Sequence, residues 1–338
     1  MVKQRGMTAI YAAAHFAVDF ACAYFMYRAL GGAEARLTAL LLYNFCAFAL
    51  QMPFGVLTDR LGNGRVFSAA GCALVAFAAA FEELPLILSI VAGTGNALFH
   101  IGGGRDVLAT SGGKAGRLGA FVSPGAFGLF LGAYLSGRLP SAPVIAAMCV
   151  SAAVILAACP CVKAKRAGAD QPPMSRGVRI KALLVLSAAF LAVCLRSHSG
   201  FLFSFDWKTG AWSWAFVMCV VLGKTLGGFA CDRFGGAFTA AVSLIAGAVL
   251  FLLSKNPVAG CAAVLLFNMT MPLTLRIAAD VLPQDAGFSF GLLTFALFLG
   301  FLPTYLGLPA PGEEWVYAAI CAVTLLFIFP ALRGRRKA

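Results

Sequence analysis

The chain has 338 residues, of which 61% are hydrophobic and only 12% are charged, and its formal net charge is +13. A soluble domain has about 25% charged residues, so this composition excludes a water-soluble fold that covers itself with polar side chains. The positive charge alone would suit a nucleic-acid partner, but its placement along the chain, given below, argues against one.

Apolar segments of membrane-spanning length follow one another along almost the whole chain. Crossing the hydrocarbon layer takes about 20 mostly apolar residues per helix, and helices are expected because unpaired backbone groups in lipid are costly. The sequence therefore predicts an all-α membrane protein with twelve transmembrane helices. In chain order the expected spans are 7–30, 36–58, 65–83, 85–107, 116–138, 142–162, 181–205, 211–231, 236–254, 257–280, 286–308 and 314–332.

The first expected span follows Lys3 and Arg5, as the apolar part of a signal peptide would. It is longer than such a segment and contains the ionisable residues His15 and Asp19, so we expect a retained helix. These two residues are four apart and share a helix face. We predict that Asp19 carries a coupling proton and that His15 tunes it. The alternative is a polar pair that only fixes helix packing.

A short sequence recurs at equivalent points of the two halves of the chain. The copy between spans 2 and 3 reads Gly55-Val-Leu-Thr-Asp59-Arg60-Leu-Gly62-Asn-Gly-Arg65, and the copy between spans 8 and 9 reads Gly228-Phe-Ala-Cys-Asp232-Arg233-Phe-Gly235-Gly236. The first glycine of each copy permits close helix approach, and the later glycine permits a tight turn. Each aspartate can bind helix-end amides or pair with an arginine.

This repeat resembles the signature loop of the major facilitator superfamily, and the resemblance covers all twelve spans. It implies two six-helix halves, 1–162 and 181–338, on either side of a basic cytoplasmic linker, 163–180. It also implies alternating access around a midplane site. In that family the loop helps to hold the outward-facing state, although the second copy here lacks a basic residue equivalent to Arg65. The residues with an implied gating role are Gly55, Asp59, Arg60, Gly62, Arg65, Gly228, Asp232 and Arg233.

Two other segments narrow the resemblance. Span 4 contains Gly95-Asn96-Ala97-Leu98-Phe99-His100, and span 7 contains Arg196-Ser197-His198-Ser199-Gly200. They are similar to segments of the fosmidomycin-resistance branch of drug efflux transporters, in which a Phe-His pair and an Arg-Ser pair occur at comparable places; this implies export. Ile101 follows His100 where that branch tends to have proline.

Span 5 carries Pro124 followed by Gly125, Gly128 and Gly132 on one helix face. This arrangement resembles the glycine-rich fifth helix of family members that work as antiporters. Ordinary small-residue helix packing is the alternative, and the two interpretations do not exclude each other.

The family architecture places helices 1, 4, 7 and 10 around the central cavity, and most deep ionisable residues of this chain fall on those helices. Two arginines face a single central acid, Asp19, so we expect an anionic or acceptor-rich solute. Arg196 is expected to bind its anionic group and to rest against Asp19 when the site is empty, while Arg276 has the alternative of pairing with Asp280. The candidates for substrate binding are Asn96, His100, Arg196, His198, Asn268 and Arg276.

Lysine and arginine gather on one side of the expected membrane, roughly eighteen residues against five, which is the positive-inside pattern. It predicts a multi-pass protein of the inner (plasma) membrane with both termini in the cytoplasm, and it explains the net charge without nucleic acid.

Several functional classes lack their motifs in this sequence. No phosphate-binding Gly-rich loop with Lys-Ser/Thr and no hydrolase or metalloprotease motif occurs, so we expect neither ATP-driven transport nor an enzyme, and no cofactor. The expected partners are a small-molecule substrate, protons and the lipid bilayer, and the resemblance implies a monomer. Two alternatives stay open: a receptor or scaffold, and a divalent transition-metal transporter that uses His15, Asp19, His100 and His198.

Overall fold

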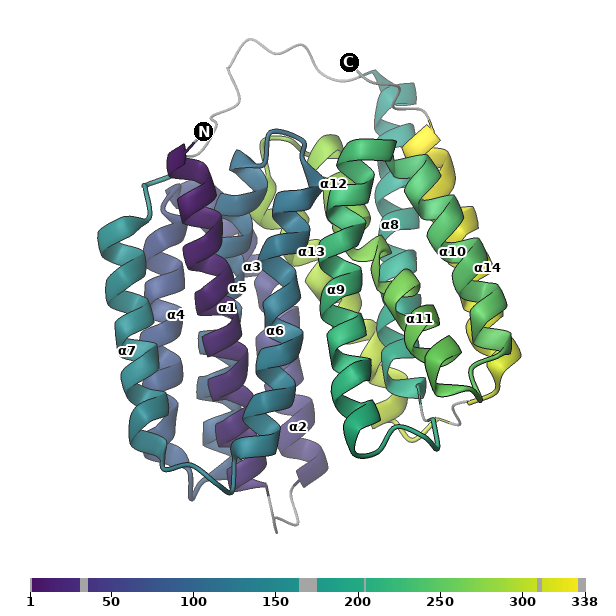
Figure 1. Ribbon diagram of the computed structural model, residues 1–338. Helices are drawn as coiled ribbons and strands as arrows, with labels where there is room; N and C mark the ends of the chain where they lie inside the picture. The colour runs from purple at the N-terminus through teal and green to yellow at the C-terminus, as the bar shows by residue number, and fades with distance from the viewer. Residues whose placement is uncertain (1, 31–35, 164–174, 204, 309–311, 334–338) are drawn as a thin grey trace. The chain divides into compact units, whose positions relative to one another are not determined.

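The computed structural model describes residues 2–30, 36–163, 175–203, 205–308 and 312–333, and these residues form helices without any strand among them (Figure 1). The helices before the predicted linker are α1 (Val2–Ala29), α2 (Arg36–Asn44), η1 (Phe45–Ala49), α3 (Gln51–Leu61), α4 (Gly64–Ala78), η2 (Ala79–Phe81), α5 (Pro85–Thr110), α6 (Ala115–Leu135) and α7 (Ser141–Ala158). Those after it are α8 (Arg176–Leu202), α9 (Ala211–Phe234), α10 (Gly236–Leu252), α11 (Pro257–Asn268), α12 (Thr270–Val281), α13 (Ala286–Tyr305) and α14 (Glu314–Arg333).

Every expected span has a helix in the structure. Among the described residues, 11 helices are long and apolar enough to cross a membrane, and the shorter α10 occupies the expected ninth span. Two of these membrane-spanning helices are made of successive helical segments. The segments α2, η1 and α3 together form 36–61, and α11 and α12 together form 257–281. The all-α membrane fold predicted from the sequence is confirmed.

At the expected linker, the helix boundaries on both sides differ from the expected ones. Helix α8 begins at Arg176, inside the expected linker, and α7 ends at Ala158, four residues before the expected end of its span. Residues 164–174 of that linker lie outside the described residues.

The contacts divide the chain into two units. Unit 1 comprises 1–110, 120–164 and 285–298, and unit 2 comprises 111–119, 165–284 and 299–338. The first turn of α6 thus belongs to unit 2, and the first turns of α13 belong to unit 1. The division of the chain into halves at 163–180 stays a prediction.

Small residues bring the helices of unit 1 close together. Helix α4 packs against α5 and α7 (Figure 1). A Cβ on Gly71 of α4 would run into the backbone of Gly95 and Phe99 of α5, and a Cβ on Gly102 of α5 would run into the backbone of Gly64. Glycine at these positions lets the two backbones touch, which is how helices associate in a solvent as apolar as their own side chains.

Candidate functional site

A buried polar cluster lies inside unit 1, between α1 and α5. His15 and Asp19 come from α1, and Asn96 and His100 come from α5; each of the four is at most 7% exposed. His15 Nε2 lies 3.2 Å from Asp19 Oδ2, and Asn96 Nδ2 donates to Asp19 Oδ1 at 3.0 Å. His100 Nε2 lies 3.6 Å from Asp19 Oδ1 and 2.8 Å from His15 Nε2. The predicted coupling pair on α1 and two of the predicted substrate-binding residues on α5 therefore form one site.

Main-chain carbonyls and aromatic rings fix the two imidazoles. His15 Nδ1 lies 2.7 Å from the carbonyl oxygen of Phe121 in α6, and His100 Nδ1 lies 2.9 Å from the carbonyl oxygen of Asn96. The rings of Phe99 and Phe121 lie 6.0 and 5.0 Å from the His15 ring, measured between centroids. The cluster is thus enclosed by apolar rings, where an unbalanced charge would be costly.

The glycine face of α6 packs on α1 beside this cluster. Cβ atoms on Gly128 and Gly132 would overlap the carbonyl oxygens of Phe16 and Phe20. A Cβ on Gly125 would overlap the carboxylate of Asp19 and the ring of His15. The packing interpretation of this glycine pattern is therefore confirmed, and Gly125 also leaves the room that the polar cluster fills. Sequence reasoning found the spacing of these glycines but did not assign Gly125 to the site.

In unit 2, Arg196 of α8 is 9% exposed, and its Nη1 donates to Thr274 Oγ1 of α12 at 3.4 Å. Within the part of the chain that the structure describes, no carboxylate forms an ion pair with Arg196. The contacts described for Asp19 all come from unit 1, so Asp19 is satisfied without Arg196. Contact between Arg196 and Asp19 stays a prediction.

The other substrate candidates of unit 2 differ in their surroundings. His198 is partly buried, and its Nδ1 is buried without a hydrogen-bond partner among the described residues. Asn268 is half-buried and donates through Nδ2 to the carbonyl of Val264 on its own helix at 2.8 Å. His198 therefore has an unused polar atom, whereas the amide of Asn268 is already engaged.

The first signature loop binds the start of α13. Asp59 accepts hydrogen bonds from the amides of Gly287 and Phe288 at 2.9 and 2.8 Å, and Arg105 Nε lies 3.5 Å from Asp59 Oδ1. Gly55 packs against the backbone of Gly287, where a Cβ would not fit. A carboxylate on the first amides of a helix matches the positive end of the helix dipole.

The second loop makes the same contact with the start of α6. Asp232 accepts from the amides of Ala115 and Gly116 at 2.8 and 2.9 Å, and Gly228 packs against the backbone of the same two residues. Arg276 Nη1 lies 3.9 Å from Asp232 Oδ1, as Arg105 lies beside Asp59 in unit 1. The missing counterpart of Arg65 therefore does not prevent this contact.

This arrangement changes the interpretation of Arg276. Its guanidinium lies 3.6 Å from Asp280 and 3.9 Å from Asp232, and its Nη1 donates to Cys231 Sγ at 3.5 Å. The expected alternative, pairing with Asp280, is what the structure has. Sequence reasoning missed that Arg105 and Arg276 occupy equivalent positions in the two halves, although their spacing of 171 residues (105 to 276) nearly equals that of the repeat.

The remaining loop residues have turn-forming or peripheral positions. Gly62 and Gly235 end α3 and α9 with φ of 64° and 90°, a conformation that favours glycine. Arg65 Nη1 donates to the carbonyl of Cys159 at 3.4 Å. Burial raises the pKa of the Cys159 thiol to about 11, so the thiol is neutral beside this arginine. Arg60 and Arg233 are exposed.

A buried network missed by sequence reasoning joins the first loop to α1. Asp106 accepts from Tyr11 Oη at 3.0 Å and from Arg105 Nη1 at 2.7 Å. Tyr11 lies four residues before His15, so the network begins one helical turn from the polar cluster. Sequence gives no sign of this network, because nothing in a single chain indicates which distant tyrosine donates to the buried acid of Asp106.

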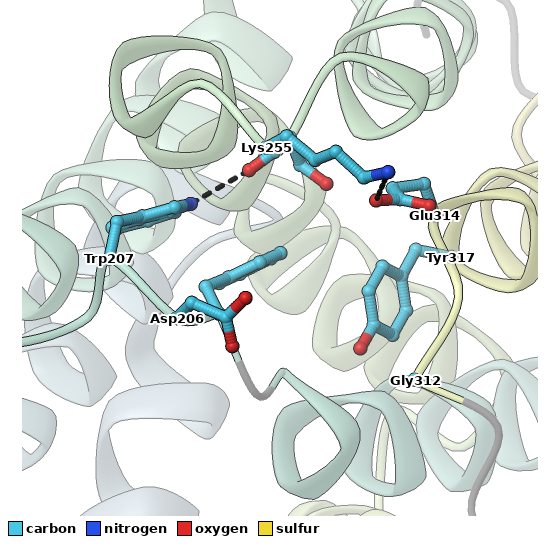
Figure 2. A pocket seen from close by; sticks show the side chains of 8 residues that line it. Asp206, Trp207, Lys255, Gly312, Glu314 and Tyr317 are labelled. Atoms are coloured by element: carbon cyan, nitrogen blue, oxygen red, sulfur yellow. Dashed lines mark hydrogen bonds and ion pairs between the residues drawn. The ribbon is translucent and has the colours of Figure 1, made fainter.

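Unit 2 also has a pocket of about 440 Å³ beyond the end of α8 (Figure 2). Phe205 and Trp207 stack at 4.8 Å, Trp207 Nε1 donates to the carbonyl of Ser254 at 2.7 Å, and Lys255 Nζ lies 3.7 Å from Glu314. Asp206 and Tyr317 complete the wall that Figure 2 shows. The pocket contains none of the residues predicted to bind substrate.

Comparison with known proteins identifies the fold. No protein-family model and no curated protein sequence matches the chain. A variant of the E. coli fucose:proton symporter FucP matches with a TM-score of 0.68 and 16% identity over 98% of both chains. FucP in the outward conformation matches with a TM-score of 0.66 and 16% identity over 96% of this chain and 99% of that chain. The human organic anion transporter MFSD10 (TETRAN) matches with a TM-score of 0.63 and 14% identity over 97% of this chain and 99% of that chain. The chain therefore has the fold of the major facilitator superfamily.

Proposed function

We propose that the chain is a secondary transporter that moves a small organic anion across the inner membrane by alternating access and exchanges it for protons. It works as a monomer, and export is the direction of transport that we propose, on the resemblance to drug-efflux segments. The similarity in fold to a sugar:proton symporter and to an organic anion transporter supports transport of small solutes in general.

The proposal of an anionic substrate rests on the surroundings of Arg196. A guanidinium stays charged even when buried, and a charge deep in a membrane-spanning helix needs a counter-charge or an aqueous cavity. The only described partner of Arg196 is a hydroxyl at 3.4 Å. A carboxylate or phosphonate on the solute would supply the missing charge. His198, with its unpaired Nδ1, offers a second contact on the same helix.

Proton coupling is assigned to the cluster in unit 1. Asp19 and His15 are ionisable groups that are 7% and 5% exposed and in direct contact. Groups of this kind inside membrane spans typically belong to proton pathways. We assign them to coupling and Arg196 to solute binding, so that each unit contributes one of the two sites.

The two aspartate contacts serve as gates. Asp59 binds the start of α13, and Asp232 binds the start of α6. Each contact joins a loop of one half of the sequence to a helix of the other half. Breaking and remaking such contacts is a familiar way to separate two conformations. We place these loops and both termini in the cytoplasm, because the positive charges gather on their side.

The test is flux in proteoliposomes with a panel of carboxylates, phosphonates and neutral counterparts. Arg196→Lys keeps the charge and loses the two-pronged donor geometry, so affinity for the anionic solute should fall about 10-fold to 100-fold, the equivalent of one charged hydrogen bond. Arg179→Lys, on the exposed start of the same helix, is the matched control and should change nothing. Unaltered affinity for every solute in Arg196→Lys and Arg196→Ala would refute the anionic substrate. Transport of a divalent transition metal instead of an organic solute would refute the proposed function as a whole.

A further inference from the structure

The two imidazoles of the unit 1 cluster face each other through the same type of atom. His15 Nε2 and His100 Nε2 are 2.8 Å apart, and the ring planes meet at 87°. This separation is that of a hydrogen bond, which needs a hydrogen on one nitrogen and a lone pair on the other. The question is which nitrogen atoms carry the hydrogens.

The other nitrogen of each ring answers that question. Both Nδ1 atoms lie against main-chain carbonyl oxygens, of Phe121 at 2.7 Å and of Asn96 at 2.9 Å. A carbonyl oxygen can only accept, so both Nδ1 atoms carry hydrogen. A neutral imidazole has one N–H. If both rings were neutral, His15 Nε2 and His100 Nε2 would meet with two lone pairs and no hydrogen between them.

We infer that one proton is shared between His15 Nε2 and His100 Nε2, so that the two histidines together form a single imidazolium in the conformation seen. Asp19 is its counter-ion, with carboxylate oxygens 3.2 Å from His15 Nε2 and 3.6 Å from His100 Nε2. The cluster then carries one positive and one negative charge and is neutral as a whole. Neutrality suits a site that is buried and closed by apolar rings.

The described contacts place the carboxylate of Asp19 beside the shared proton. On α1, Tyr11 lies a turn away, with its hydroxyl directed to Asp106. On α5, Asn96 donates its amide to Asp19. On α6, the facing groups are the carbonyl of Phe121 and the bare Cα of Gly125. The ion pairs described for the cluster are those of His15 and His100 with Asp19.

The same geometry disfavours a metal ion as the occupant. One ligand atom each from His15, Asp19 and His100 lies within 4.8 Å of the others, as a metal site would require. Two imidazole nitrogens bound to one tetrahedral zinc, each about 2.0–2.1 Å from it, lie roughly 3.3 Å apart. At 2.8 Å the two nitrogens lie closer together than two ligands of one zinc ion, at the separation of a hydrogen bond.

This inference rests on the proposed function only for its use in transport, and it changes two assignments. His100 becomes a partner in proton binding and no longer a substrate ligand. The coupling proton sits on the histidine pair, with Asp19 as its counter-charge. Loss of the proton leaves two lone pairs opposed and a buried carboxylate uncompensated, so the rings must separate. Since His15 and His100 are on α1 and α5, release of the proton is tied to movement between these helices.

The experiment uses the histidine content of the chain, which is three residues. Full-length protein with ¹⁵N-labelled histidine is measured by NMR at neutral pH, with His198→Gln to identify the third ring. We expect a nitrogen–nitrogen coupling across the His15–His100 hydrogen bond, unchanged by His198→Gln and lost in His100→Gln. Because the two rings hold one extra proton between them, its removal on raising the pH should change the signals of both rings in one common step.

Two results would overturn the inference. One is a pair of neutral rings without any coupling at neutral pH. The other is bound metal at one per chain, whose removal by a chelator shifts both rings. Because wild-type protein alone gives the coupling and the common titration step, the test does not depend on the folding of a variant. Failure of the proposed function is separate: the coupling would be present while no pH gradient drives solute flux.

Discussion

The contact between Asp59 and the start of α13 should set how often that end of unit 1 opens. Asp59→Asn leaves one acceptor oxygen of two, so one of the amides of Gly287 and Phe288 loses its bond, and the charge beside the helix start is lost. A hydrogen bond to a charged group contributes about 1.5–3 kcal/mol. With the Asp59 side chain only 10% exposed, we take a loss of about 2 kcal/mol, which corresponds to a roughly 30-fold increase in the open population.

A buried cysteine can report that population. Ser289 lies in the first turn of α13 and is 0% exposed, so Ser289→Cys in a cysteine-free background reacts with a maleimide only when the helix start opens. The alkylation rate should rise roughly 30-fold in Asp59→Asn. Asp232→Asn, read out at Leu118→Cys in α6, should give a smaller increase of about fivefold, because the Asp232 side chain is 24% exposed and water screens its contact.

Glu83→Gln is the control, because Glu83 is an exposed loop acid. Its alkylation rate should equal that of the parent. If Asp59→Asn leaves the rate at Ser289→Cys within threefold of the parent, the carboxylate does not hold α13 and the gating argument fails.

Three further predictions follow from the same contacts. Gly125→Ala places a Cβ against the Asp19–His15 pair and should lower the melting temperature, with a destabilisation of about 1–3 kcal/mol. Gly137→Ala is the control, because Gly137 has open space around it, and it should leave the melting temperature unchanged. Equal melting curves for the two variants would show that the cluster can accommodate the added methyl group. Tyr11→Phe removes a donor from the buried Asp106 and should destabilise by about 1–3 kcal/mol in thermal unfolding; no change would mean that water replaces the hydroxyl. For the topology, a single cysteine at position 314 should react with an impermeant reagent added outside the cell. A single cysteine at position 170 should react only after permeabilisation. The reverse pattern would refute cytoplasmic termini.

The fold could be predicted from sequence because lipid restricts the choices. A chain with so few charges must span, each span must be helical, and the Gly/Asp-Arg/Gly repeat marks equivalent points of two halves. Glycine positions also carried information, since Gly55 and Gly228 pack against backbone as expected.

The site could be predicted only in part. The four-residue spacing of His15 and Asp19 indicated one helix face, and both residues are in contact. Sequence could not show that His100 completes this cluster, because contact between α1 and α5 depends on how the helices pack. For the same reason the sequence left two roles open for Arg276, substrate binding and a pair with Asp280. In the structure its neighbours are Asp232 and Asp280. Local periodicity gives the face of one helix but not its partner across the bundle.

Proton movement accompanying solute movement tests the central claim most directly. Proteoliposomes containing a trapped pH dye are given an outward gradient of the organic anion that the panel identifies, without any imposed pH gradient. The account predicts a change of internal pH that follows solute flux in the wild type, and solute exchange without that pH change in Asp19→Asn. Solute flux with no pH change in the wild type, or an unchanged pH signal in Asp19→Asn, would contradict it.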